Sequence, residues 1–193
     1  MLIVIDNFFT PGELNLVTEE VKKLEFYDTL SHPESESAEE IPNYPGIRTD
    51  KLRKVHPLLN SFIIRKIERT GATFGQRPWT QNQYAHLRLE KDNAGEYIHQ
   101  DLDDWAYLIY LSETNLDSGT KMYESVKSAP FIKMSSFSEK DKSKDKEHTL
   151  VKFVQNRIVM FDSLIPHMAW NNHGNDMSDG RLTINGFCQY DNS

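Results

Sequence analysis

The sequence predicts a mainly β protein with N-terminal helices, in which many short strands form an antiparallel double sheet, or jelly roll. From residue 79 onward, short runs of alternating or continuous apolar character are separated by Asn, Asp, Gly and Ser. Many short strands with turn signals between them are typical of a sandwich or barrel. Before residue 79, apolar residues instead recur at helical spacing. The 193 residues fit a single domain, with a strand and supporting helices in 1–78 and the β core in 79–193.

The N-terminal segment predicts a strand followed by an amphipathic helix. Residues 2–5, "LIVI", are apolar and mostly β-branched, which favours a strand. Thr10 is placed to cap a helix, with Pro11 at its first position and Glu13 at its third, a capping-box arrangement. One apolar stripe follows at helical spacing, and we expect it to pack in the core: Leu14, Val17, Val21 and Leu24.

A second helix is predicted in "HPLLNSFIIRKIERTGA", residues 56–72, ending near Gly71. Its expected apolar face consists of Leu58, Leu59, Phe62, Ile63 and Ile67. Residues 31–46 are polar and contain three prolines, which predicts a loop. In the adjoining "NYPGIRTDKL", Tyr44, Arg48 and Asp50 surround a Pro-Gly turn. This turn either covers the mouth of a pocket or packs as an ordinary surface turn.

The β core is predicted from eight runs, which are "NQYAHLRLE" (82–90), "EYIHQD" (96–101), "WAYLIYLS" (105–112), "GTKMYES" (119–125), "HTLVKFV" (148–154), "RIVMFDS" (157–163), "HMAWNN" (167–172) and "RLTINGFCQY" (181–190). Residues 125–149 interrupt them with a stretch of alternating charge, "SEKDKSKDKEH". We expect a solvated insertion there, or a lid over a site.

Composition excludes several classes of function. The net charge is −7 and no segment concentrates Lys and Arg, so nucleic-acid binding is not expected. The single cysteine, Cys188, excludes an intrachain disulfide and suits a reducing, cytoplasmic setting. No apolar stretch approaches the length of a membrane span, and the N-terminus lacks the features of a signal peptide.

The run "EYIHQD" carries the spacing of a metal site. On a strand, Tyr97, His99 and Asp101 would share one face, so the imidazole and the carboxylate would converge on one point. A third ligand must come from another strand, and His167, after "FDSLIP", is the candidate. His173, in a loop close to the same strand, is the rival.

Two histidines and one carboxylate leave half of an octahedral sphere open, as in the facial triad of non-heme Fe(II) oxygenases. Such a site needs an anchor for the distal carboxylate of a co-substrate, and a guanidinium matches that group best. In "DGRLTINGF", Arg181 and Thr183 share one face of a predicted strand. A charged Arg in an apolar strand is costly unless it meets an anion.

The order of these motifs resembles the 2-oxoglutarate/Fe(II)-dependent dioxygenases over roughly residues 80–190. The shared features are His-x-Asp, a strand ending in Tyr-Leu, a Gly-Thr turn, "FDSLIPH" and Arg-x-Thr. The similarity is greatest to the prolyl-hydroxylase-like branch and its small phage and bacterial relatives. The resemblance implies a cupin-like double-stranded β-helix, with residues 79–193 as the catalytic core. Asn156 stands where the family usually has a glycine, and Asn tolerates the left-handed conformation.

The resemblance also implies the roles of individual residues. His99, Asp101 and His167 would bind Fe(II). The C5 carboxylate of 2-oxoglutarate would be held by Arg181, helped by Thr183 and Tyr110. The "SGT" turn, with Gly119 and Thr120, matches a Gly-Gly-Thr turn of the family.

The implied activity is hydroxylation of a peptidyl or small-molecule substrate, with 2-oxoglutarate and dioxygen consumed and succinate and CO2 released. Asp101 favours hydroxylation over halogenation, because halogenating members lose that carboxylate to make room for halide. Two other classes stay open at this point. A cupin-like protein could bind a metal or ligand without turnover, and a β-sandwich interaction protein would place His99 and His167 far apart.

Overall fold

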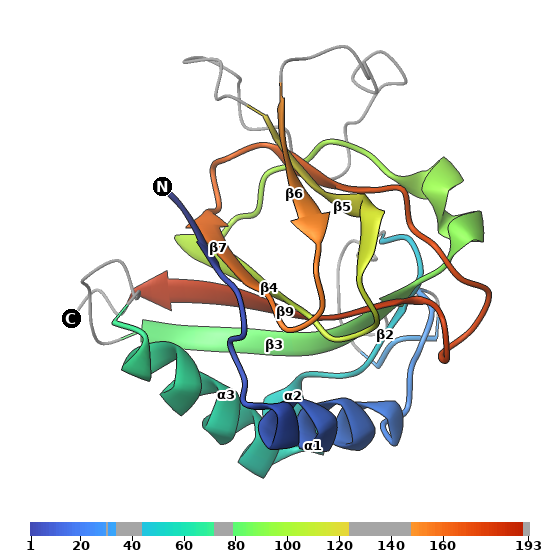
Figure 1. The fold of residues 1–193 in the computed structure, drawn as a ribbon. Coiled ribbons are helices and arrows are strands. Elements are labelled where there is room, and N and C mark those ends of the chain that lie inside the picture. Colours follow the sequence, from blue (N-terminus) through green and yellow to red (C-terminus); the bar gives the residue numbers. More distant parts are fainter. Residues whose placement is uncertain (30, 34–43, 72–78, 124–147, 191–193) are drawn as a thin grey trace.

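The computed structural model describes residues 1–29, 31–33, 44–71, 79–123 and 148–190, and these form two antiparallel sheets with helices on one side (Figure 1). The large sheet has the order β1 (Leu2–Ile5), β7 (Ile158–Asp162), β4 (Trp105–Tyr110), β9 (Arg181–Tyr190), β3 (Trp79–Arg88) and β2 (Ile47–Arg48). The small sheet has the order β6 (His148–Phe153), β5 (Asn115–Tyr123) and β8 (His167–Trp170). The prediction of a mainly β protein with N-terminal helices is confirmed.

From β4 onward the chain crosses repeatedly between the two sheets. From β4 in the large sheet the chain passes to β5 and β6 in the small sheet, returns to β7, crosses to β8 and returns to β9. β9 pairs with both β3 and β4 and thereby lies near the middle of the large sheet. This alternation brings residues that are distant in the sequence into the space between the sheets.

The helices pack against the outer face of the large sheet, as Figure 1 shows. They are α1 (Pro11–Lys22), α2 (Leu52–Val55) and α3 (Pro57–Arg69). The predicted capping box is present: the amide of Glu13 donates to Thr10 Oγ1 at 3.3 Å, and the amide of Thr10 donates to Glu13 Oε2 at 2.8 Å. Val17 and Val21 are fully buried in the core.

The predicted apolar face of the second helix needs one correction, and α2 was not predicted. Leu59, Ile63 and Ile67 follow each other at intervals of four residues and are buried. Leu58 is 81% exposed, so its assignment to the core face was wrong. It precedes Leu59 by one position, which on a helix turns the side chain away from the stripe.

The segment 96–101 differs from its prediction as well. It forms no regular strand, and the 3-10 helix η1 (Glu90–Gly95) precedes it. A single bridge joins it to β8, in which His99 N donates to His167 O at 2.9 Å and His167 N donates to His99 O at 2.8 Å. Asp101 N then turns to Ser163 O at 3.1 Å. This single bridge positions His99 next to His167, but it does not make the segment a regular strand.

The remaining predictions concern turns and connections. Asn156 has φ 66°, as expected for a left-handed position, and its side chain bonds both the N–H and the C=O of Phe9 at 2.8 and 2.7 Å. Most of the 31–46 loop and of the 125–149 insertion lies outside the described residues. A helix long and apolar enough to cross a membrane does not occur in the described parts of the chain.

Candidate metal centre and anion pocket

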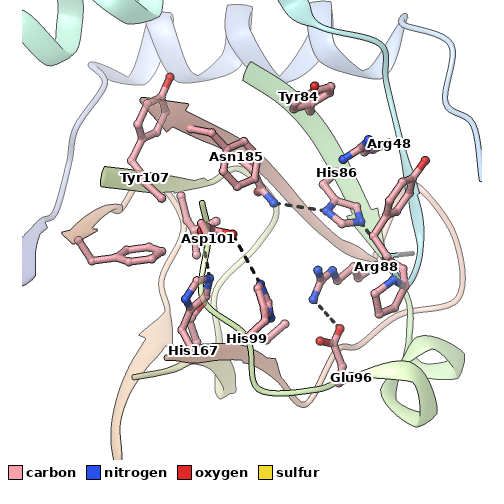
Figure 2. A pocket seen from close by; sticks show the side chains of 18 of the residues that line it. Arg48, Tyr84, His86, Arg88, Glu96, His99, Asp101, Tyr107, His167 and Asn185 are labelled. Atoms are coloured by element: carbon pink, nitrogen blue, oxygen red, sulfur yellow. Dashed lines mark hydrogen bonds and ion pairs between the residues drawn. The ribbon is translucent and has the colours of Figure 1, made fainter. Parts of the chain in front are cut away.

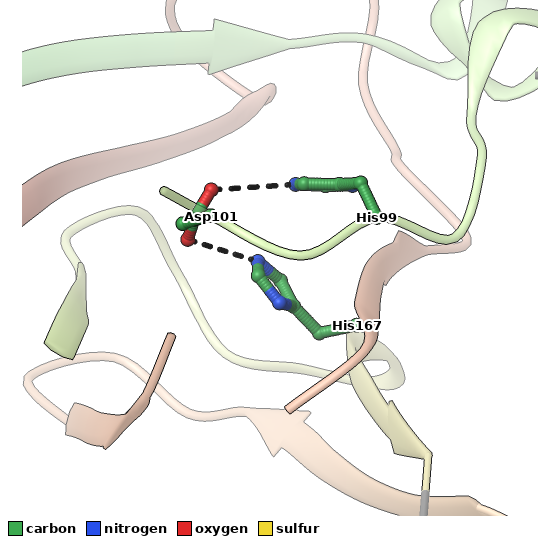
Figure 3. A group of neighbouring side chains, drawn as sticks. All are labelled: His99, Asp101 and His167. Carbon is green, nitrogen blue, oxygen red and sulfur yellow. Dashed lines mark ion pairs between the residues drawn. The ribbon is translucent and has the colours of Figure 1, made fainter. Parts of the chain in front are cut away.

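The structure brings the three predicted ligands together. His99 and Asp101 lie on the segment after η1, and His167 is the first residue of β8. Their ligand atoms all lie within 4.8 Å of one another. His99 Nε2 is 3.9 Å from Asp101 Oδ1, and His167 Nε2 is 3.5 Å from Asp101 Oδ2 (Figure 3). The backbone bridge between positions 99 and 167 accounts for this convergence.

Backbone carbonyls orient both imidazoles. His99 Nδ1 lies 3.2 Å from Tyr97 O, and His167 Nδ1 lies 2.9 Å from Ile165 O. A carbonyl oxygen only accepts, so each ring carries its proton on Nδ1 and turns the Nε2 lone pair toward Asp101. Second partners of this kind fix the tautomer of metal-binding histidines.

The electrostatics of the three residues favour a cation. Burial lowers the pKa of His99 well below its usual value, and the charge of His167 lowers it further, so the imidazole is neutral at pH 7. Burial raises the pKa of Asp101, although His167 and Arg88 act in the opposite direction. A carboxylate buried beside the neutral imidazole of His99 is costly until a cation balances it. Two imidazole nitrogens and a carboxylate suit Fe(II) and related divalent ions.

His173, the alternative third ligand suggested by the sequence, does not belong to this cluster. Its ring packs edge-on against Phe153, with centroids 5.4 Å apart. The group of possible metal ligands among the described residues consists of His99, Asp101 and His167. The structure thus places His167, rather than His173, beside His99 and Asp101, and His167 was the candidate chosen from the sequence.

A cavity of about 240 Å³ between the two sheets is lined by the three ligands and by Arg181. Figure 2 shows this cavity with the three ligands labelled. Arg181 is 3% exposed, and its Nη2 donates to Thr120 Oγ1 at 3.2 Å. Its Nε is buried without a hydrogen-bond partner, and no carboxylate among the described residues forms an ion pair with it. Burial lowers the pKa of Arg181 to about 10, so the guanidinium is still charged at neutral pH. Within the part of the chain that the structure describes, this buried cationic group therefore has no anionic partner.

Tyr110 and Thr183 lie behind the cavity wall. The Tyr110 hydroxyl is 2.8 Å from Thr120 Oγ1, and its ring centroid is 5.6 Å from the guanidinium carbon of Arg181. Thr183 Oγ1 donates to Asn185 Oδ1 at 2.7 Å. Thr120 and Arg181 line the cavity, whereas Tyr110 and Thr183 support the residues that do.

Sequence reasoning missed two buried features of the pocket on β3. Arg88 forms an ion pair with Glu96, from Nη1 to Oε1 at 2.5 Å. His86 is held between Pro45 O at 2.8 Å and Asn185 Nδ2 at 3.3 Å, so its ring serves as a neutral hydrogen-bonding link. The alternation of Tyr84, His86 and Arg88 on one face of a predicted strand was the available signal.

The 44–48 segment reaches the cavity. This favours the interpretation of its Pro-Gly turn as part of the pocket rather than as an ordinary surface turn. Tyr44, Pro45 and Arg48 are among the lining residues. The guanidinium carbon of Arg48 lies 4.0 Å from the ring centroid of Tyr44 and 4.5 Å from that of Tyr84. Such cation–π contacts hold a long side chain in one orientation.

Comparison with known proteins places the fold. No protein-family model and no curated protein sequence matches the chain. Among solved structures, HygX from Streptomyces hygroscopicus with nickel and 2-oxoglutarate bound superposes with a TM-score of 0.68 at 15% identity, covering 99% of this chain and 83% of that one. SnoN, a non-heme alpha-ketoglutarate-dependent epimerase from nogalamycin biosynthesis, gives a TM-score of 0.67 at 10% identity, covering 98% and 76%. SnoK, a carbocyclase from the same biosynthesis, gives 0.66 at 13%, covering 97% and 79%. At these identities the likeness shows a shared fold.

Proposed function

We propose that the protein is a 2-oxoglutarate- and Fe(II)-dependent oxygenase whose two sheets form a cupin-like double-stranded β-helix. The observation that carries this proposal is one cavity that contains both the cluster of His99, Asp101 and His167 and the buried Arg181. A metal site alone would suit many proteins. A metal site that shares a cavity with a buried guanidinium suits an anionic co-substrate.

The donor set fits Fe(II). His99, Asp101 and His167 would occupy one face of an octahedral ion and leave the other positions to exogenous ligands. When bound there, iron would supply the activation of dioxygen, while the protein supplies orientation and a buried cavity. The Nδ1 bonds to Tyr97 O and Ile165 O hold both imidazoles ready for the ion.

Arg181 is the proposed anchor for the C5 carboxylate of 2-oxoglutarate. Thr120 bonds its Nη2 directly, and Tyr110 bonds Thr120 in turn, so the guanidinium has a defined orientation. Thr183, on the same face of β9, donates to Asn185, which also lines the cavity. HygX, which shares the fold, holds nickel and 2-oxoglutarate in its own structure.

The proposed reaction is hydroxylation of a peptidyl or small-molecule substrate, in which dioxygen and 2-oxoglutarate are consumed and succinate and CO2 are released. Retention of Asp101 as the carboxylate ligand supports hydroxylation over halogenation. The alternative of a cupin-like protein that binds a metal or ligand without turnover gives the buried Arg181 no role. SnoN and SnoK are an epimerase and a carbocyclase, so the products must be identified chemically.

Anaerobic titration of the protein with Fe(II) and 2-oxoglutarate tests the proposal. We expect a weak visible charge-transfer band that requires both components. The His167→Ala variant should abolish the band, whereas His173→Ala, a histidine next to the same strand, should retain it. A band that survives in His167→Ala, or that never forms in the wild type, would contradict the proposed site.

A further inference from the structure

Two buried arginines lie directly opposite each other at the end of the β3–β9 ladder. Arg88 and Arg181 are cross-strand partners, 8% and 3% exposed, and both line the cavity. Like charges opposite each other on neighbouring strands are destabilising, and burial adds a desolvation cost. Two buried like charges in one cavity therefore point to a function of this pair rather than to a contribution to stability.

A carboxylate, that of Glu96, is bonded to one member of this pair, Arg88, and is itself held in place. Glu96 Oε1 accepts from Arg88 Nη1 and also from Asn172 Nδ2 at 2.8 Å. Asn172 is itself fixed by Asn93, through bonds of 2.7 and 2.9 Å in opposite directions. Glu96 therefore sets the orientation of Arg88 and balances one of the two positive charges.

The two guanidinium groups keep unused donors. The Nε atoms of Arg88 and Arg181 are both buried without a hydrogen-bond partner among the described residues. An unsatisfied charged donor of this kind is expensive in a protein interior. Both arginines line the same cavity, so one ligand with two acceptor ends could contact both guanidinium groups.

Arg88 lies within reach of both ends of the cavity. It is the cross-strand partner of Arg181, and its ion-pair partner Glu96 lies three residues before His99, on the segment that carries two of the metal ligands. Figure 2 shows Arg88 joined to Glu96, with His99 and Asp101 among the labelled side chains of the same pocket. A molecule that extends from the metal to Arg181 would therefore meet Arg88 at the metal end.

We propose that Arg88 binds the C1 carboxylate of 2-oxoglutarate, opposite the C5 carboxylate held by Arg181. This inference rests on the proposed function. A 2-oxo acid that chelates a metal uses one oxygen of its C1 carboxylate, and the second oxygen needs a donor in a buried site. A guanidinium fixed by Glu96 supplies that donor with little loss of side-chain entropy. Arg88 thus recognises the 2-oxo acid end of the co-substrate, and Arg181 recognises its length and second charge.

A 2-oxo acid that lacks the C5 carboxylate distinguishes the proposed role of Arg88 from that of Arg181. 2-Oxopentanoate has the same C1 and C2 groups as 2-oxoglutarate but a methyl group in place of the C5 carboxylate. The matched variants are Arg181→Gln and the double variant Arg88→Gln/Glu96→Gln, in which no lone carboxylate is left buried. Affinities for both acids are measured anaerobically on the Fe(II) protein from the charge-transfer band, and the affinity for Fe(II) alone is measured separately.

We expect Arg88→Gln/Glu96→Gln to weaken both acids equally, by about 10- to 100-fold, the effect of losing a charged hydrogen bond. Arg181→Gln should weaken 2-oxoglutarate similarly and leave 2-oxopentanoate as in the wild type. If the double variant does not fold, Arg88→Lys keeps the charge, and we expect a smaller loss for both acids.

Unchanged affinity for both acids in the Arg88 variants would overturn the inference and assign Arg88 to the primary substrate or to structure alone. That result is distinguishable from failure of the proposed function, in which the wild type itself forms no band with 2-oxoglutarate.

Discussion

On strand β9, the side chains that face the helices are apolar, whereas those that face the small sheet are mostly polar or charged. Leu182, Ile184 and Cys188 belong to the core shared with α1 and α3. Arg181 and Asn185, which alternate with them, line the cavity. The alternation follows from the two-residue period of a strand, so one backbone segment serves both surfaces.

The difference shows where this molecule separates stability from chemistry. The helix side gains its stability from close packing of apolar groups around fully buried positions such as Ile63 and Ile184. The cavity side retains buried charges that packing alone would disfavour, Arg88 and Arg181 among them. Substitutions on the two faces should therefore change different measurements, and this expectation can be tested.

The largest effect is expected for Ile184→Ala. Ile184 is fully buried in the core beneath the helices, and truncating it leaves a cavity. The free energy of unfolding should fall by about 2–5 kcal/mol, as measured by denaturant titration. The affinity of the folded protein for Fe(II) and 2-oxoglutarate should stay within a few-fold of the wild type. A strong loss of affinity would mean that the two faces are not independent.

Arg181→Leu tests the opposite face of the same strand. We expect 2-oxoglutarate binding to weaken by about 10- to 100-fold because a charged hydrogen bond is lost, while Fe(II) binding persists. The free energy of unfolding should be equal to that of the wild type or higher, since an apolar group replaces a buried charge that has no ion-pair partner in the described parts of the chain. Calorimetric titration and denaturant unfolding measure the two effects. A less stable protein with normal 2-oxoglutarate affinity would make Arg181 structural.

Most of the fold could be predicted from local sequence patterns. The runs that became β4, β6, β7, β8 and β9 alternate or are continuously apolar, and the capping box at Thr10 depends on residues only three positions apart. His99 and Asp101 were predictable as a pair for the same reason. Their meeting with His167 came from family resemblance, because the 67 residues between His99 and His167 contain no local signal for the bridge.

The unpredicted features depend on chain geometry that local sequence patterns do not specify. The ion pair of Arg88 with Glu96 requires η1 to fold back over the end of β3. The pairing of Arg88 with Arg181 depends on the register of two strands that are far apart in the sequence. His86 could not be classified without knowing that Pro45 and Asn185 lie on either side of it.

A smaller effect is expected from acidification, through His86 on the cavity side. Burial lowers the pKa of His86 well below 6.5, and the charges of Arg88, Arg48 and Arg181 lower it further, against a hydrogen bond to Pro45 O that raises it. Below pH 6.5 the unfolded chain binds a proton that the folded protein excludes, so stability is complete above this pH and falls as the pH decreases. His86 contributes a slope of at most about 1.4 kcal/mol per pH unit.

His86→Gln should therefore flatten the dependence of unfolding free energy on pH between 6.5 and 5, without removing it, because the pKa of His99 is lowered in the same direction. Denaturant titrations of the metal-free protein at several pH values measure the slope. Identical slopes in the wild type and the variant would show that His86 does not exclude the proton.

The smallest effect is expected at the start of α1, where Thr10→Ala removes the cap on the helix side of the comparison. Thr10 Oγ1 accepts from the amide of Glu13, and Lys66 of α3 bonds the same Glu13 carboxylate at 2.6 Å. Loss of the cap in Thr10→Ala should lower the free energy of unfolding by about 1 kcal/mol. Thr10→Ser keeps the capping hydroxyl, so its free energy of unfolding should be close to that of the wild type. Because α1 lies on the face of the large sheet away from the cavity, neither variant should alter 2-oxoglutarate affinity. Equal destabilisation by Ala and Ser would assign the effect to packing of the threonine methyl group rather than to the hydroxyl, and a change in affinity would show that the two faces are coupled through the sheet.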